Sequence, residues 1–239
     1  MSDADRTKPT MREPHGDDEK AQLLQQLTVV QQSLLWKVDE LSDKDLRRPM
    51  TQSGTNLIGI VKHLTGITYG YLCSSFGRAR ETLLWELDEE LLHGLDMWAT
   101  PDESTADIVA AYRRACAAAA ETINQLGLDA TGRRRSGAPT TLREMIITVL
   151  VDTTRHAGHA DVIREMIDGR IGFGPGDAMV YHDDEHLRMY RARITGEIDR
   201  QTWLAYNRSR PGYDPDAWDK YQRQVADSWP LTTQPPERR

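Results

Sequence analysis

The chain has 239 residues, 38% hydrophobic and 28% charged, a composition typical of one soluble globular domain, alone or with an appendage. Its formal net charge of −7, from 30 Lys and Arg against 37 Asp and Glu, disfavours nucleic acids and anionic membranes as partners. Apolar runs fall short of the ~20 residues that a membrane helix needs, no signal peptide is recognisable, and two cysteines are too few for a disulfide framework, so we expect a cytoplasmic protein.

Hydrophobic periodicity predicts four long helices after a polar arm. We expect residues 1–16 to be disordered, because they are polar and show no periodicity. Apolar residues then recur at spacings of three and four, which is typical of amphipathic helices. The first helix extends from Asp17 or Asp18, as its cap, to about Leu41, and the second from Ser53 or Thr55 to about Gly77. The third follows the cap Ser104 and ends near Gly127, and the fourth extends from about Thr140 or Thr141 to Gly169.

Four long helices joined by loops predict an all-α fold, a four-helix bundle that covers residues 17–170. The connection from Gly77 to Ser104 is long for a bundle and is rich in leucine and tryptophan, so we expect it to pack over one end. A long crossover of this kind permits an order other than simple up-down-up-down.

The remaining residues, 171–239, predict a partly helical, aromatic-rich extension. Glycines and a proline between 172 and 176 end the fourth helix. Nine of the sixteen aromatic residues follow, so most of this segment is not a simple linker. A short helix is predicted from Asp214 to Trp229. The extension could cover a site, widen a dimer interface or select a substrate, and the sequence leaves these alternatives open.

Two helices carry polar residues on otherwise apolar faces. His63 belongs to the inward stripe of the second helix. On the fourth helix Asp152 and His156 lie four residues apart, so their side chains meet on the face that Val149 and Ile163 share. Buried polar groups on such a face are costly unless they have partners.

A carboxylate and two imidazoles from facing helices could bind a divalent metal ion and leave one position open. The alternative is a buried network of His, Asp and Thr without an ion. Because Asp-x-x-x-His is a common helical spacing, the pattern taken by itself favours that network. His159 follows one turn after His156 and adds a further polar group to the same region.

Other candidate residues have a more ordinary interpretation. His182 and His186 resemble a second metal pair, but no apolar face surrounds them, so a solvated helix start is favoured. Cys73 has no cation next to it in the sequence, which favours a structural thiol. Two groups of basic residues could contact an anionic cosubstrate: Arg133, Arg134 and Arg135 before the fourth helix, and Arg155 and Arg164 within it. A solvated loop is the favoured interpretation of the first group. Solvated side chains, or pairing with Asp161 or Glu165, are favoured for the second.

Four stretches of the sequence, 35–42, 53–66, 96–105 and 155–165, resemble the DinB-like superfamily in its actinobacterial mini-circle-protein-like and mycothiol transferase branch. The resemblance implies an up-down-down-up four-helix bundle, often dimeric, with one divalent metal ion. Zinc is the first choice, with nickel, iron or manganese as alternatives. The family's three ligands match His63, Asp152 and His156.

The family has His or Glu at the position of Asp152, so the shorter aspartate puts the ligand geometry in question. His159 could hold a metal-bound imidazole in place, shuttle a proton or replace a ligand, and the first role is favoured. We assign it as the candidate catalytic residue.

The resemblance implies a metal-dependent thiol S-transferase. The ion would activate mycothiol or a similar small thiol to attack an electrophilic small molecule. The expected partners are therefore these two small molecules, with a second copy of the chain as a possible homodimer and with neither nucleic acid nor membrane. The alternatives are a metal-binding stress or interaction protein without catalysis, and a metal-dependent hydrolase.

Overall fold

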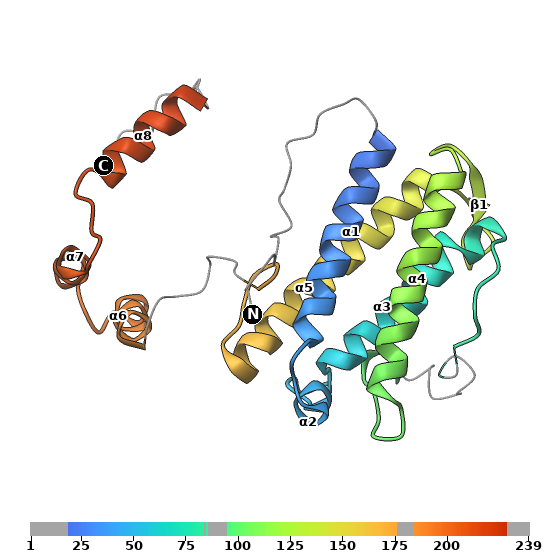
Figure 1. The fold of residues 1–239 in the computed structure, drawn as a ribbon, viewed down its shortest axis with the longest axis horizontal. Coiled ribbons are helices and arrows are strands. Elements are labelled where there is room, and N and C mark those ends of the chain that lie inside the picture. Colours follow the sequence, from blue (N-terminus) through green and yellow to red (C-terminus); the bar gives the residue numbers. More distant parts are fainter. Residues whose placement is uncertain (1–18, 84, 86–94, 176–183, 229–239) are drawn as a thin grey trace, which may run out of the picture. The chain divides into compact units, whose positions relative to one another are not determined.

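The computed structural model describes residues 19–83, 85, 95–175 and 184–228, and Figure 1 shows their fold. These residues belong to two compact units, Met1–Val180 and Tyr181–Arg239. The first unit contains the predicted bundle, and the second contains most of the predicted extension. The expected disordered arm and the expected cap at Asp17 or Asp18 lie outside the described residues.

Four long helices form the bundle: α1 (Glu19–Val38), α3 (Leu57–Leu72), α4 (Thr105–Gln125) and α5 (Leu142–Asp168). They correspond to the four helices predicted from periodicity, which confirms the all-α fold class, although the second ends at Leu72 and not near Gly77. A short helix, α2 (Asp43–Arg47), follows α1. The first helix ends at Val38 and not near Leu41 as predicted, because Glu40 has a φ of 59°, a left-handed conformation that interrupts a helix.

Side-chain caps determine where three of the helices begin. Ser104 caps α4 and Thr141 caps α5, both at predicted positions. The cap of α3 is Asn56, and the prediction of Ser53 or Thr55 is wrong. The Asn56 side chain accepts from a backbone N–H in the first turn of α3 at 2.8 Å and also donates to a carbonyl of α2 at 3.1 Å, a second bond that only the fold provides.

The four helices follow the predicted up-down-down-up order (Figure 1). At the start of α1, Glu19 pairs with Arg143 at the start of α5 at 2.9 Å, so these two helices are parallel. Lys20, also at the start of α1, donates to the carbonyl of Leu126 just after α4, so α1 and α4 are antiparallel. The ribbon of α3 points the same way as α4. Within the bundle, α3 makes most of its contacts with α4 and α5 and lies between them.

The connection between α3 and α4 is long because two parallel helices require the chain to return along the bundle. Its described parts include two 3-10 turns, η1 (Ser74–Phe76) and η4 (Leu95–Met97). Leu83 is buried and Trp85 packs against the hydrophobic core. The described part of the crossover therefore covers the bundle, as its apolar composition predicts.

A short antiparallel hairpin, β1 (Thr131–Arg133) and β2 (Pro139–Thr141), lies where the sequence predicts only a loop. Gly137 closes its turn with a φ of 84°, which favours glycine. Gly132 packs against η1, since a side chain at this position would collide with the backbone oxygen of Ser75. The hairpin is thus attached to the end of α3 by a tertiary contact that periodicity does not indicate.

The core consists of the predicted apolar stripes. Its buried members include Leu27, Val30, Leu34, Leu57, Ile60, Val61, Leu64, Ile108, Tyr112, Ala115, Ala119, Ile123, Leu142, Met145, Ile146, Val149 and Ile163. Near the end of α5, the apolar side chain of Met166 is 61% exposed. The core-facing row of α5 continues from Ile163 to Ile167 instead, and neighbouring positions on a helix point about 100° apart.

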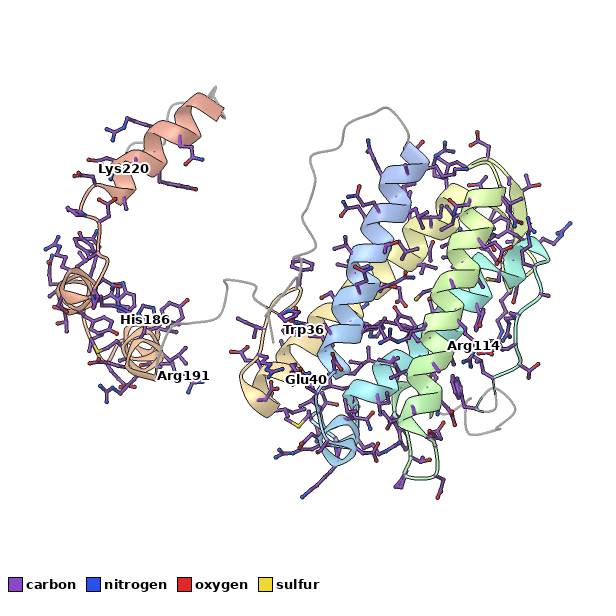
Figure 2. The ribbon with its side chains drawn as sticks, viewed as in Figure 1. Trp36, Glu40, Arg114, His186, Arg191 and Lys220 are labelled. Atoms are coloured by element: carbon purple, nitrogen blue, oxygen red, sulfur yellow. The ribbon has the colours of Figure 1, made fainter. Side chains whose placement is uncertain are left out.

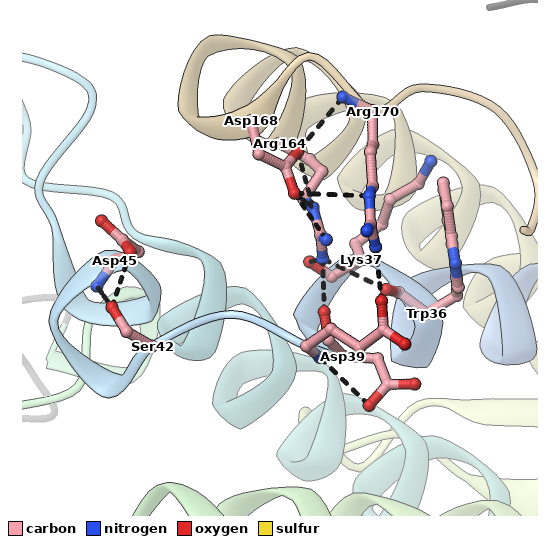
Figure 3. Close-up of polar contacts among 9 residues, drawn as sticks. Trp36, Lys37, Asp39, Ser42, Asp45, Arg164, Asp168 and Arg170 are labelled. Atoms are coloured by element: carbon pink, nitrogen blue, oxygen red, sulfur yellow. Dashed lines mark hydrogen bonds and ion pairs between the residues drawn. The ribbon is translucent and has the colours of Figure 1, made fainter.

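Arg164 is fully buried and pairs with Asp168, so neither expected role, solvation or pairing with Asp161 or Glu165, is the one observed. Figure 3 shows its guanidinium between the ends of α1 and α5. It donates to the backbone carbonyls of Lys37 at 2.9 Å and Asp39 at 2.7 Å, and it pairs with Asp168 at 2.7 Å. The last carbonyls of a helix lack partners within it. Arg164 donates hydrogen bonds to such carbonyls at the end of α1 and therefore connects α1 to α5.

The second unit contains α6 (Asp184–Thr195), α7 (Arg200–Ser209) and α8 (Ala217–Ser228). The favoured helix start near His186 corresponds to α6, α8 was predicted to start three residues earlier, and α7 was not predicted. Four aromatic side chains of α6 and α7 pack with ring centroids 5.5 to 6.5 Å apart: His186, Tyr190, Trp203 and Tyr206. His186 is labelled in Figure 2. In the part of the chain that the structure describes, no helix has the length and apolarity needed to cross a bilayer.

Candidate metal centre

Three side chains predicted to share a site converge between α3 and α5. His63 comes from α3, and Asp152 and His156 come from one face of α5. One potential ligand atom from each lies within 4.8 Å of the other two. Asp152 Oδ2 is 3.6 Å from His63 Nε2, and Asp152 Oδ1 is 3.8 Å from His156 Nε2. Ligand atoms around a tetrahedral zinc ion are about 3.4 Å apart, given bonds of about 2.1 Å, so the spacing suits such an ion.

The hydrogen-bonding state of these groups distinguishes a metal centre from a polar network. Both Asp152 contacts are longer than a hydrogen bond. Among the described residues, buried Asp152 Oδ2 and His156 Nδ1 have no hydrogen-bond partner. An unsatisfied buried polar atom costs about 1–3 kcal/mol. In a polar network without an ion, these atoms would have hydrogen-bond partners, and they have none among the described residues. A bound cation would be the missing partner of the Asp152 carboxylate. The set of potential ligands therefore fits a divalent metal.

Asp96 orients His63, a role that the sequence interpretation missed. The Asp96 carboxylate accepts from His63 Nδ1 at 2.6 Å. This bond places the proton on Nδ1 and leaves the lone pair of Nε2 facing Asp152. The only sequence signal for Asp96 is its position in the matched stretch 96–105. The sequence favours His159 for the role of holding a metal-bound imidazole.

The packing of η4 on α3 brings Asp96 to His63. Gly59 lies one turn before His63 on α3, and a side chain there would collide with backbone atoms of the two residues after Asp96. Further along the crossover, Glu103 pairs at 2.6 Å with Lys62, whose side chain is completely buried. The absence of a side chain at one position and a buried ion pair at another therefore hold η4 beside the site.

His159 lies at the edge of the site. Its side chain is exposed, and its ring is edge-on to that of His156 with centroids 5.3 Å apart. Among the described residues, His156 Nδ1 has no hydrogen-bond partner, so this nitrogen does not bond to the His159 ring. His159 therefore makes no hydrogen bond that would orient His156.

The environment of His156 favours its neutral form. Burial lowers the pKa of His156, and the nearby His63 lowers it further, while Asp152 acts in the opposite direction. A metal ion binds the neutral imidazole, so this pKa shift keeps a ligand available at pH values where a free histidine begins to protonate.

A cavity of about 860 Å³ adjoins the candidate centre. His63 and Asp96 form part of its lining, together with Gly66, Gly70 and Ser74 along α3 and its end, and with Arg133, Arg134 and Arg135 around the hairpin. Arg133 and Arg135 are exposed, in agreement with the favoured interpretation of a solvated loop, and all three arginines also line this cavity. The cavity is large enough for a small-molecule substrate.

A family model of mycothiol-S-transferases matches residues 22–169. The chain belongs to this family. The match contains all three residues of the candidate centre and almost the whole bundle, and it ends before the second unit begins. This confirms the DinB-like, mycothiol-transferase resemblance and supports a mycothiol-related transferase. No curated protein matches the chain.

The remaining candidate residues do not belong to the convergent group or lie outside the described residues. His182 is outside them, and His186 belongs to the aromatic group of the second unit. Cys73 is buried, and burial raises the pKa of its thiol. Burial also raises the pKa of Cys116 to about 12. Both cysteines are therefore protonated at neutral pH, which suits structural thiols.

If Asp96 orients His63, its removal weakens metal binding without abolishing it. We expect Asp96→Ala to lower zinc affinity about 10- to 100-fold, the usual effect of removing the partner of a ligating histidine. Asp102→Ala, an exposed aspartate on the same connection, is the matched control. Affinity is measured by competition with a chromophoric chelator, and equal affinities of the two variants would contradict the role of Asp96.

Proposed function

We propose that the chain is a metal-dependent thiol S-transferase that joins mycothiol to an electrophilic small molecule. His63, Asp152 and His156 would hold one divalent ion, with zinc as first choice. The observation that carries the proposal is the convergence of three potential ligand atoms, one of them a buried Asp152 oxygen without a hydrogen-bond partner among the described residues. The chain belongs to the mycothiol-S-transferase family.

The bound ion would lower the pKa of a thiol so that it is deprotonated near neutral pH. The protein's own residues do the rest. Asp96 holds His63 in the tautomer that presents Nε2. His159, which is exposed beside His156, would accept the thiol proton and release it to solvent.

The adjoining cavity holds the electrophile next to His63. The sulfur attacks an electrophilic carbon of this molecule and a C–S bond forms. The leaving group then departs with the bonding electron pair. Positioning both reactants in one cavity makes the attack effectively intramolecular, which accelerates it.

The proposal is tested with full-length protein purified without chelator. Elemental analysis measures the metal, and conjugation of monobromobimane is followed separately with mycothiol, bacillithiol and glutathione. We expect about one ion per chain, turnover with mycothiol, loss of turnover after chelation and recovery with zinc. Absence of turnover with all three thiols in the metal-loaded protein would overturn the proposal.

Cobalt substitution separates this function from hydrolysis. If the open position takes a thiol, adding mycothiol changes the visible spectrum of the cobalt protein. An unchanged spectrum at saturating mycothiol would favour a hydrolase or a metal-binding protein without catalysis.

A further inference from the structure

One wall of the cavity is strongly basic. Arg133, Arg134 and Arg135 from the hairpin region line the cavity together with Arg80 from the crossover and Lys62 from α3. Asp96, which bonds to His63, is the acidic residue in the described lining. Because the chain carries a net charge of −7, its average composition does not explain such a wall.

Two of these cations have no carboxylate partner in the part of the chain that the structure describes. Arg133 donates to the carbonyl of Gly137 at 3.1 Å, and Arg135 makes no ion pair there. Lys62 is paired with Glu103, and Arg134 lies 3.6 Å from Glu144, so their charges are partly balanced. The unbalanced positive charge of the wall is therefore concentrated at Arg133 and Arg135.

The geometry leads from the candidate centre to this wall. Gly66 and Gly70 follow His63 along α3, and a side chain added at Gly70 would meet no atom within 4 Å, so this helix face is open. His63 and Gly70 are seven residues apart, about 10 Å along the helix axis. The contact of Gly132 with η1 holds the hairpin at the far end of that face.

We propose that the electrophile carries a carboxylate, which Arg133 and Arg135 bind while its reactive carbon lies near His63. This inference rests on the proposed function. Mycothiol provides no carboxylate of its own, since its cysteine is acetylated at nitrogen and joined to a sugar through an amide. With mycothiol as the thiol, the negative charge that the wall accepts therefore belongs to the electrophile. Guanidinium groups suit it because they bind carboxylates through paired, charge-assisted hydrogen bonds.

The test compares an acid with its neutral amide in zinc-loaded, full-length protein. Titration calorimetry measures the binding of 3,5-dinitrobenzoate and 3,5-dinitrobenzamide, neither of which has a leaving group. We expect the acid to bind at least about 10-fold more tightly, as one or two charge-assisted hydrogen bonds provide. The double variant Arg133→Gln/Arg135→Gln should lose this preference. Arg113→Gln, an exposed arginine of α4 outside the lining, should keep it.

Each alternative result has a distinct meaning. Equal binding of acid and amide, or a preference that survives the double variant, overturns the inference. Competition with the acid by glutathione but not by mycothiol, dependent on the same arginines, assigns the carboxylate to the thiol and also overturns it. An intact acid preference in a protein without thiol turnover contradicts the proposed function alone, because the calorimetry requires no reaction.

Discussion

Replacing His63 by alanine is expected to remove the metal ion from the purified protein. His63 would be the ligand from α3, while Asp152 and His156 both come from α5. Without it two side chains of one helix remain, which is too few to complete a protein-bound zinc site. We expect the metal content to fall from about one ion per chain to nearly none, and affinity to fall by more than about 100-fold, beyond the effect of removing a residue that only orients a ligand.

His159→Ala is the matched control for His63→Ala. It removes another imidazole from the same region, but His159 is exposed and does not belong to the convergent group. We expect this variant to keep its metal. Circular dichroism of both variants in excess chelator verifies that the bundle remains folded. Full metal content in the His63 variant, or equal loss in the His159 variant, would contradict the assigned ligand set.

Replacing Arg164 by methionine is expected to destabilise the bundle by about 3–5 kcal/mol, as the removal of one partner from a buried ion pair does. The guanidinium is fully buried and bonds to Asp168 and to carbonyls at the end of α1. Methionine fills a similar volume but donates no hydrogen bond. It therefore leaves those carbonyls and the Asp168 carboxylate without their partner. Urea denaturation measures the change in free energy of unfolding.

Arg155→Met is the matched control for Arg164→Met. Arg155 belongs to the same helix but is exposed, so we expect a change within about 0.5 kcal/mol. If the two variants unfold at the same urea concentration, the bonds of Arg164 contribute nothing measurable and the assigned role is wrong.

The helices and the convergent residues could be predicted because both depend on local spacing. Apolar residues three and four apart identify the buried face of a helix wherever that helix packs. The same rule puts Asp152 and His156 together before any fold is known. His63 was placed on an inward stripe by periodicity, and the family resemblance then joined it to the pair on α5. Those predictions required only the sequence, the expectation of a helical bundle and the family resemblance.

Tertiary structure alone decided which other residues reach the site. Asp96 meets His63 because η4 packs over Gly59, and the arginines of the hairpin reach the cavity because Gly132 packs against η1. Arg164 is buried because the ends of α1 and α5 meet around it. Each contact joins segments far apart in the sequence through backbone approach. Helical periodicity records which face of a helix is apolar, and it contains no information about which loop, turn or helix end comes to lie on that face.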